Sequence, residues 1–376
     1  MALKFWIHLP FFFPDIEESY ASLLDQAVDI AQAAEDLGFE GIVVPENNFN
    51  NYATNPSSLQ MIAMLGAKTT TLKFLSGVLI LPNYNPLLLA GQVALADHMT
   101  KGRLSCGVAR GGGPYIADRI GFDGSKAREM YEESVEILEK AWTEFDITYD
   151  GRFWSFPETT VLPRPYQSPY PKLWTAAQTE AGIKAVGAKG HNLMNSPNYG
   201  TFAPHGDIEQ AVRFFDEGAR EAGVERGEML IGRRVWIEET EEEAERHVTE
   251  IYRHWSLYAS GAKSKPNVEG ENRFQVRDSN GPTGWDRSNR VIKGGKLVPN
   301  EMDIPLDNIY ERYDDPIVTS AEKAVTRFKY YEGLGIDHVS SLMAMGASTA
   351  EIIHSMEVMS EHVFPAFAPA ESAVSR

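Results

Sequence analysis

Hydrophobic and polar residues alternate along the chain with two periods, one typical of buried strands and one of amphipathic helices. Short runs rich in β-branched and aromatic residues indicate strands, whereas longer stretches with an apolar residue at every third or fourth position indicate helices. The strand pattern covers residues 4–9, 41–45, 72–81, 103–108, 173–176, 192–194, 230–237 and 338–342. The helical pattern covers residues 19–37, 56–68, 86–99, 125–142, 180–189, 208–222, 241–258, 320–333 and 349–362.

Strands and helices follow one another in this way along nearly the whole chain. Each of the eight predicted strands is followed by a helix, and this alternation implies parallel strands joined by right-handed crossovers. Eight such units favour a closed barrel, because open doubly wound sheets usually have fewer strands. We therefore predict an α/β protein with a (β/α)₈ TIM barrel, formed by a single domain over residues 1–376.

Two segments interrupt this alternation. Residues 147–171 contain five prolines, so we expect an ordered excursion without a strand or a helix. Residues 261–305 are polar, rich in Gly and Asn, and carry a cluster of basic residues. So long a loop is usually functional or mobile.

The overall charge narrows the range of partners. The 376 residues include 35 Lys and Arg against 53 Asp and Glu, a formal net charge of −18, which disfavours binding to nucleic acid or to an anionic membrane surface. The single cysteine, Cys106, rules out an intrachain disulfide and fits a reducing compartment. No targeting signal is visible, and the apolar stretches are too short to span a membrane. The expected location is the cytoplasm.

Several common catalytic motifs are missing. The sequence lacks the glycine fingerprint of dinucleotide-binding folds, the P-loop, the HExxH zinc motif and the nucleophile elbow of serine hydrolases. His247 and His254 lie seven residues apart on one predicted helix, but no third ligand is near them in the sequence. We therefore predict no metal site.

Two strand ends carry groups suited to an anion. Arg110 follows the strand at 103–108 and precedes three glycines, whose backbone amides can hold a phosphate beside the guanidinium. Thr179 lies where the strand at 173–176 runs into a helix, and the free amides of that helix N-terminus also suit a phosphate. The alternatives are a flexible turn with a surface ion pair at Arg110 and an ordinary helix cap at Thr179.

Polar groups also follow the first two strands. Glu46 and Asn47 come directly after the strand at 41–45, a position from which they can orient or polarise a substrate. A turn that uses asparagine for local hydrogen bonds is the alternative. His8 ends the first strand in a strongly apolar setting and is the best titratable candidate, because histidine titrates near neutral pH. This position is at least as compatible with a core histidine whose hydrogen bonds are satisfied within the protein.

The chain contains, in this order, the stretches GFEGIVVPENNF, LKFLSGVLILP, DHMTKGRLSCGVARG, VLPRPYQSPYPKLW, AAQTEAG and EIIHSMEVMSEHVFPAF. Together they resemble the bacterial luciferase superfamily of flavin-dependent monooxygenases, and especially the luciferase alpha subunit. The resemblance covers nearly the whole chain. It implies a TIM barrel that uses reduced FMN and oxygen, with the flavin supplied by a separate flavin reductase.

The resemblance also implies roles for individual residues. By similarity, Arg110, Gln178 and Thr179 hold the FMN phosphate. Gly77–Val78 falls where the family has a non-prolyl cis peptide under the flavin ring, and a glycine eases that geometry. Trp255 matches an indole that lies near the flavin. Residues 261–299 match the family's mobile loop that shields the site from solvent, and their basic cluster adds to the expectation of a lid. Ion pairing with acidic helices of the same barrel stays open as the alternative.

Two departures from the luciferase pattern change the expected activity. Asn47 stands where the pattern has its catalytic histidine, and an amide is not a general base at neutral pH. Ala109 replaces the cysteine that precedes the phosphate-binding arginine. We therefore expect a monooxygenase that oxygenates a small, largely apolar substrate through a flavin C4a-peroxide, without light emission. His8 is a candidate for the acid–base role.

Two other functions stay open. A deazaflavin-dependent oxidoreductase of the same superfamily would transfer hydride without oxygen, and a non-catalytic flavin-binding protein is compatible with the lost histidine. The family is usually dimeric through the helices beside the second and third strands, here 56–68 and 86–99. The apolar content of both segments exceeds what one buried stripe needs, so we expect a homodimer.

Overall fold

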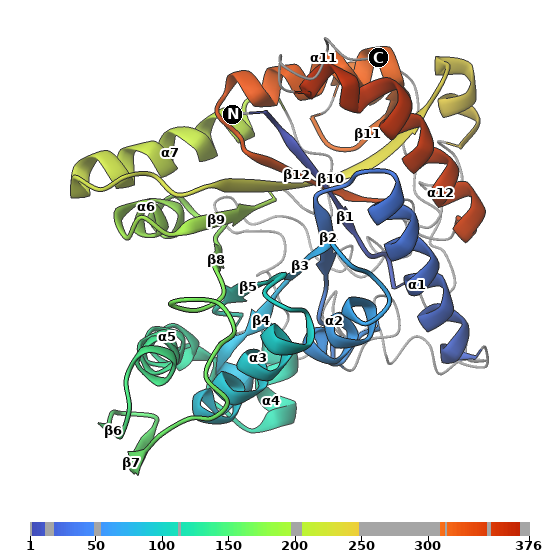
Figure 1. The fold of residues 1–376 in the computed structure, drawn as a ribbon. Helices are drawn as coiled ribbons and strands as arrows, with labels where there is room; N and C mark the ends of the chain where they lie inside the picture. Colours follow the sequence, from blue (N-terminus) through green and yellow to red (C-terminus); the bar gives the residue numbers. More distant parts are fainter. Residues whose placement is uncertain are drawn as a thin grey trace.

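Eight parallel strands close into a barrel (Figure 1). The computed structural model describes residues 2–11, 19–48, 54–111, 114–196, 205–247, 309–312, 314–343 and 347–368. In order around the barrel the strands are β1 (Lys4–His8), β2 (Gly41–Val44), β3 (Lys73–Ser76), β5 (Leu104–Ala109), β8 (Leu173–Ala176), β9 (Asn192–Asn195), β10 (Met229–Glu238) and β12 (His338–Leu342). Parallel pairing of β12 with β1 closes the ring, which confirms the predicted fold class.

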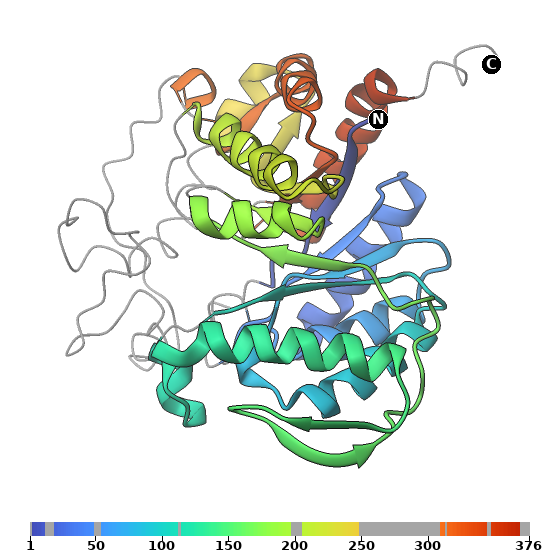
Figure 2. The same cartoon turned by 90° about the vertical axis from the view of Figure 1, so that its left-hand side faces the viewer.

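Helices surround the barrel on its outer side (Figures 1 and 2). They are α1 (Tyr20–Asp36), α2 (Ser58–Gly66), α3 (Pro86–Met99), α5 (Ala127–Thr143), α6 (Glu180–Ala188), α7 (Asp207–Ala222), α11 (Ala321–Gly333) and α12 (Thr349–Val358), with the shorter α4 (Pro114–Ile120) and α10 (Ile309–Arg312). Their hydrophobic periodicity explains the packing. In α7, for example, Ile208, Ala211, Val212 and Phe215 are buried, and this spacing places them on one face of the helix.

Apolar side chains fill the middle of the barrel. The interior cluster consists of Trp6, Val43, Leu75, Trp174, Met194 and Leu230, while the larger core lies between the strands and the helices. His338 also faces the interior, where its Nδ1 accepts a hydrogen bond from Nε1 of Trp6 at 2.9 Å. Because the barrel is packed in this way, a site for a small molecule is expected at the carboxyl ends of the strands.

Residues 147–171 contain a β-hairpin, so the expectation of an excursion without regular elements is wrong. In this hairpin β6 (Ile147–Asp150) pairs antiparallel with β7 (Ser155–Thr159). Its turn is held by Glu133 of α5, whose carboxylate accepts hydrogen bonds from the backbone amides of Phe153 and Trp154 at 3.1 and 2.8 Å. These partners lie 20 and 21 positions apart in the chain, beyond the reach of local periodicity.

Other elements also differ from the prediction. The strand predicted over 72–81 is divided into β3 and β4 (Leu79–Ile80). An unpredicted strand, β11 (Ile317–Ser320), pairs with the carboxyl-terminal half of β10. The last helix continues into a π-helical turn at Met359–Val363. Residues 241–247 are helical as expected, but the rest of that predicted helix and the segment 261–305 lie outside the described residues. Within the described ranges, no helix has the length and apolar character needed to cross a membrane.

Candidate active site

The sequence-predicted site residues gather at the carboxyl ends of the barrel strands. Figure 2 shows the barrel from the side, with the start of β1 on the right, so that the strands end toward the left. His8 ends β1, Ala109 ends β5, and Gln178 follows β8 by two residues. Trp255, the residue expected near the flavin, lies outside the described part of the chain.

His8 points into the barrel interior. It lies two positions after Trp6 of the interior cluster, and side chains two apart on a strand face the same side. Its Cε1 would be 3.9 Å from a β-carbon placed on Gly77, so the imidazole lies beside that residue. Burial lowers the pKa of His8 to about 4. At neutral pH the ring is therefore neutral, with one nitrogen able to donate and one able to accept.

A cis peptide bond joins Gly77 and Val78, as the family resemblance implied. A side chain at Gly77 would collide with Val43, so only glycine fits here. Val78 is half-buried and packs against the interior cluster. Contact between the Gly77–Val78 segment and a flavin ring stays a prediction.

Glu46 is buried at the mouth of the barrel, and both of its carboxylate oxygens have protein partners. Oε2 accepts hydrogen bonds from the backbone amide and the hydroxyl of Ser58, each at 2.9 Å, and Oε1 accepts one from the hydroxyl of Tyr84. Burial raises the pKa of Glu46, and these hydrogen bonds partly offset that rise. A direct catalytic role for Glu46 stays a prediction.

The loop that carries Asn47 is fixed through Asn55. The backbone amide of Asn47 donates to the carbonyl of Asn55 at 2.8 Å, and Nδ2 of Asn55 donates to the carbonyl of Pro45 at 2.6 Å. Asn47 is half-buried. Its backbone is therefore held in place at the end of β2, where its amide side chain can serve as a positioned hydrogen-bonding group.

Arg110 carries an exposed guanidinium at the end of β5. Among the described residues it has no hydrogen-bond or ion-pair partner, so the alternative of a surface ion pair finds no support there. The register pairs Val108 with Thr175, which brings Arg110 opposite Ala177, just before Gln178. The two predicted anion-binding positions, Arg110 and Thr179, thus come from neighbouring strands.

Gln178 and Thr179 make different contacts. Oγ1 of Thr179 accepts a hydrogen bond from the amide of Gly182 at 3.2 Å and so caps α6, as the sequence predicts. The carboxamide of Gln178 binds Ser196, donating to its carbonyl at 3.0 Å and accepting from its amide at 3.2 Å in the orientation that satisfies both atoms. The Gln178 side chain is therefore already engaged by the protein.

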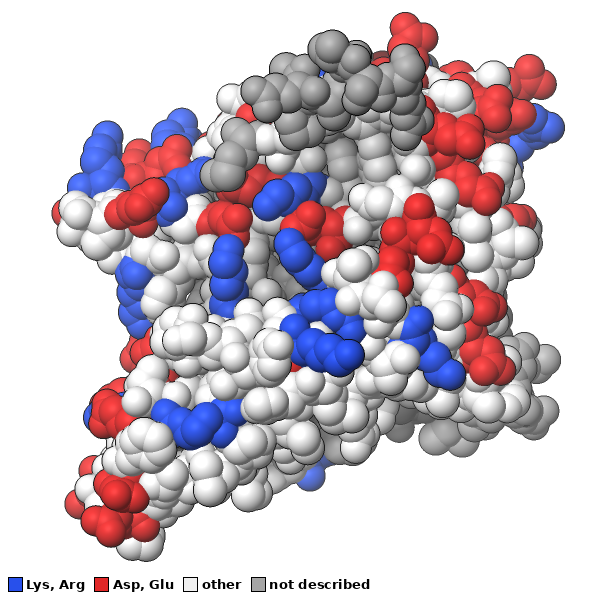
Figure 3. Space-filling model, in the orientation of Figure 1, with Lys and Arg blue, Asp and Glu red and all other residues white. Residues whose placement is uncertain are grey.

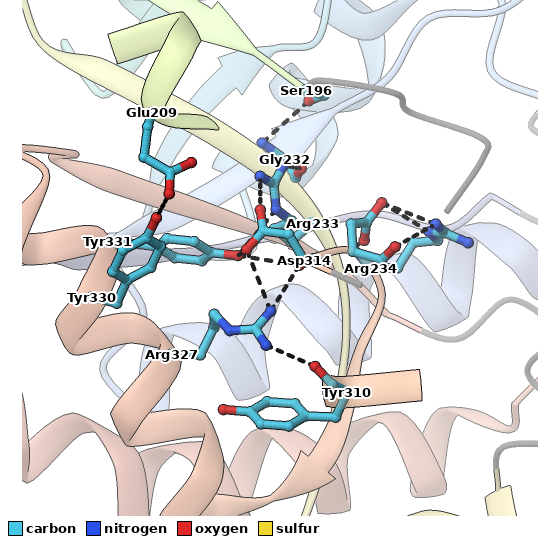
Figure 4. Close-up of polar contacts among 11 residues, drawn as sticks. Ser196, Glu209, Gly232, Arg233, Arg234, Tyr310, Asp314, Arg327, Tyr330 and Tyr331 are labelled. Carbon is cyan, nitrogen blue, oxygen red and sulfur yellow. Dashed lines mark hydrogen bonds and ion pairs between the residues drawn. The ribbon is translucent and has the colours of Figure 1, made fainter. Parts of the chain in front are cut away.

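Ser196 is a site residue that the sequence analysis missed. It follows β9 directly, and its Oγ accepts a hydrogen bond from the backbone amide of Gly232 at 3.2 Å (Figure 4). The signal that could have found it is its position, because polar residues just beyond the carboxyl end of a barrel strand face the site. The strand at 192–194 was predicted, but the serine after it was not considered.

The described groups suit an anionic cofactor with a flat ring. Arg110 and the amide end of α6 can hold a phosphate. Gly77, Ala109 and Ala176 are half-buried at the mouth, and such small residues leave room for a ring to approach the backbone. In the same ranges, no group of three His, Cys, Asp or Glu side chains is placed to bind a metal ion.

Residues 3–338 match the family model described as luciferase-like monooxygenase, so the chain belongs to this family. It is accordingly an oxidoreductase. Comparison with individual proteins agrees with this. The chain is 25% identical, over 96% of its length and 94% of the relative's, to the oxygenase component of the flavin-dependent trigonelline monooxygenase of Acinetobacter baylyi.

Solved structures share the fold. The oxygenating constituent of 3,6-diketocamphane monooxygenase from Pseudomonas putida, a type II Baeyer–Villiger monooxygenase in complex with FMN, has a TM-score of 0.75 at 19% identity, covering 97% of this chain and 99% of that one. An F420-dependent secondary alcohol dehydrogenase has a TM-score of 0.69 at 17% identity, covering 98% and 100%. At these identities the likeness concerns the fold alone.

Proposed function

We propose that this protein is the oxygenase component of a two-component monooxygenase, which uses reduced FMN and oxygen to oxygenate a small, largely apolar organic substrate. The observation that carries the proposal is the exposed Arg110 guanidinium beside the capped start of α6, since this pair of groups suits the phosphate of FMN. The flavin would come from a separate reductase, because the related trigonelline enzyme is named as an oxygenase component.

Each named residue has a part in this proposal. Arg110 and the amides that follow Thr179 hold the phosphate, and the neutral imidazole of His8 exchanges a proton with the substrate near Gly77. Asn47 orients the substrate by hydrogen bonding, and Glu46 positions the Asn47 loop through Ser58 and Tyr84.

When bound, reduced flavin would supply the electrons that activate oxygen. The apolar interior formed by residues such as Trp174 and Met194 lies directly beneath the site and limits the access of water from below. This setting favours a substrate whose body is apolar. Val78 contributes further apolar surface at the mouth.

The decisive test measures oxygen consumption with a generic flavin reductase, NADH and FMN, in the presence of a panel of small organic compounds. Mass spectrometry should detect a product heavier by one oxygen atom. Oxygen uptake that no compound stimulates would contradict the proposal.

A deazaflavin-dependent oxidoreductase is the second candidate, because an F420-dependent alcohol dehydrogenase shares this barrel fold and the fold by itself does not separate the two. Such an enzyme would transfer hydride without consuming oxygen. Reconstitution with FMN or with the deazaflavin, followed by separate affinity measurements, distinguishes the two. Tight binding of the deazaflavin alone would favour the second candidate.

We also propose a homodimer through α3. This helix exposes Leu88, Leu95 and Met99, at 68, 53 and 50% of their surfaces. Leu162 and Tyr166 extend the apolar surface beside it, since Val161 and Leu162 lie next to Gly91 and the ring of Tyr166 packs on His98. The apolar residues of α2, in contrast, are largely buried within the chain, so α3 carries the exposed part of the predicted interface.

A further inference from the structure

One hydroxyl at the mouth of the barrel is held by groups from three neighbouring strands. Ser196 follows β9 and is half-buried. Its backbone amide and carbonyl are bound by the carboxamide of Gln178, which follows β8, at 3.2 and 3.0 Å. Its Oγ accepts a hydrogen bond from the amide of Gly232 in β10 at 3.2 Å. Both the backbone and the hydroxyl oxygen of Ser196 are thus fixed by protein contacts.

The support behind Gly232 is rigid. A side chain at Gly232 would collide with Oγ of Ser196, so glycine is needed for this close approach. The carbonyl of Gly232 accepts a hydrogen bond from Nη1 of Arg233 at 3.0 Å, and the guanidinium of Arg233 is itself anchored by Asp314 at 2.5 Å. Figure 4 shows this chain of contacts running from Ser196 to the buried Arg233 and Asp314.

The hydroxyl proton of Ser196 remains available. A serine hydroxyl has one hydrogen to donate and two lone pairs to accept with, and the Gly232 amide uses a lone pair. No residue in the described part of the chain accepts the hydrogen. A fixed donor whose hydrogen has no acceptor among the described residues is a group that a ligand can satisfy at little entropic cost.

We propose that the Ser196 hydroxyl donates a hydrogen bond to an acceptor oxygen of the bound flavin, and that Gln178 is the residue that positions Ser196. This inference rests on the proposed function. It changes the role expected for Gln178. The carboxamide of Gln178 binds the backbone of Ser196, so Gln178 acts on the flavin through Ser196. Ser196 lies two strands from Arg110 around the barrel, about 10 Å at the usual spacing of neighbouring strands, so one ligand of the size of FMN can reach both.

The test measures dissociation constants of oxidised FMN and riboflavin by quenching of flavin fluorescence, without turnover. Ser196→Ala should weaken flavin binding about fivefold to tenfold, the usual effect of one lost hydrogen bond. Ser134→Ala is the matched control, because it also removes a serine hydroxyl, but one that is buried in α5 on the outer side of the barrel and has no hydrogen-bond partner among the described residues. Circular dichroism checks that each variant is folded.

The two flavins locate the acceptor. If Ser196→Ala weakens the binding of FMN alone, the acceptor is a phosphate oxygen. If it weakens the binding of both flavins equally, the acceptor is an oxygen of the ring or the ribityl chain. Either result supports the inference. Unchanged affinities in folded Ser196→Ala overturn it while leaving the proposed function intact. Wild-type protein that binds neither flavin overturns the proposed function and this inference together.

Gln178→Ala tests the positioning role. If Gln178 acts through Ser196, Gln178→Ala should weaken binding in the wild-type background but add little in the Ser196→Ala background. Additive losses in the double variant would show that Gln178 contacts the flavin itself, which contradicts the positioning role.

Discussion

Arg110 presents its guanidinium at the mouth of the barrel with no protein partner in the described ranges, so its removal should affect a ligand more than the fold. We expect Arg110→Ala to weaken FMN binding by roughly 1.5–3 kcal/mol, the loss of a charge-assisted hydrogen bond. Riboflavin, which lacks the phosphate, should bind equally well to both proteins. Fluorescence titration measures both affinities.

The control for this prediction is Arg128→Ala, which removes an exposed arginine paired with Glu132 on α5. It should leave both affinities unchanged. If Arg110→Ala is folded and binds FMN as tightly as the wild type, Arg110 does not belong to the phosphate site.

His8 makes the stability of the fold sensitive to acid. Burial lowers the pKa of His8 to about 4, whereas in an unfolded chain it is about 6.5. Between these values the unfolded chain binds a proton that the native protein does not, so the native state loses stability as the pH falls from about 6.5 to 4. The loss should reach about 3 kcal/mol at most.

Urea unfolding at pH 7, 5.5 and 4.5 measures this effect. His8→Gln should lose less stability than the wild type over that interval, because it has no proton to take up. His362→Gln, which changes a histidine with an exposed side chain, should follow the wild type. Identical pH dependence in all three proteins would show that His8 titrates normally.

Among the elements, a buried ion-pair network joins β10 to α11. Arg233 and Asp314 are completely or almost completely buried and bonded at 2.5 Å, and Arg327 and Tyr331 of α11 also bind Asp314 (Figure 4). Asp314→Ala would leave the buried guanidinium of Arg233 without the carboxylate that it pairs with. We expect the free energy of unfolding to fall by about 3–5 kcal/mol, as measured by urea denaturation.

A surface pair provides the matched control. Asp216 lies 3.4 Å from Arg226 with 54% of its side chain exposed, and Asp216→Ala should cost less than about 1 kcal/mol. A similar small loss for both variants would mean that the buried network contributes no more than a solvated pair.

At the scale of the whole molecule, the surface carries both clusters of charged side chains and an exposed apolar patch. Figure 3 shows acidic side chains gathered over α1 and α12 and basic ones near the centre of the same face. α3 instead exposes Leu88, Leu95 and Met99, and an apolar surface of this kind is typical of an interface. We expect wild-type protein at micromolar concentration to have twice the mass of one chain.

Light scattering measures this mass directly. Leu95→Glu places a charge in the centre of the α3 surface and should give a single chain, because an unpaired charge is costly to bury. Val224→Glu, which changes an exposed apolar residue beyond the end of α7, should stay dimeric. A wild-type protein with the mass of one chain would refute the interface.

The sequence by itself determined the barrel. The predicted strands at 41–45, 173–176 and 338–342 agree closely with β2, β8 and β12, and the strand order follows from the rule for parallel crossovers. These features depend on residues near one another in the chain, where hydrophobic periodicity and the breaks made by glycine and proline are strong signals. The position of the site at the strand ends follows from the barrel itself.

Only the tertiary structure decided which groups meet at the site. Glu46 binds Tyr84, 38 positions further on, Gln178 binds Ser196, and β11 joins β10 across more than 70 residues. Periodicity tells which face of an element is buried, but it does not tell which polar group lies opposite. That choice depends on how strands and loops pack in three dimensions, because a buried polar group is satisfied by any partner that the fold brings within reach.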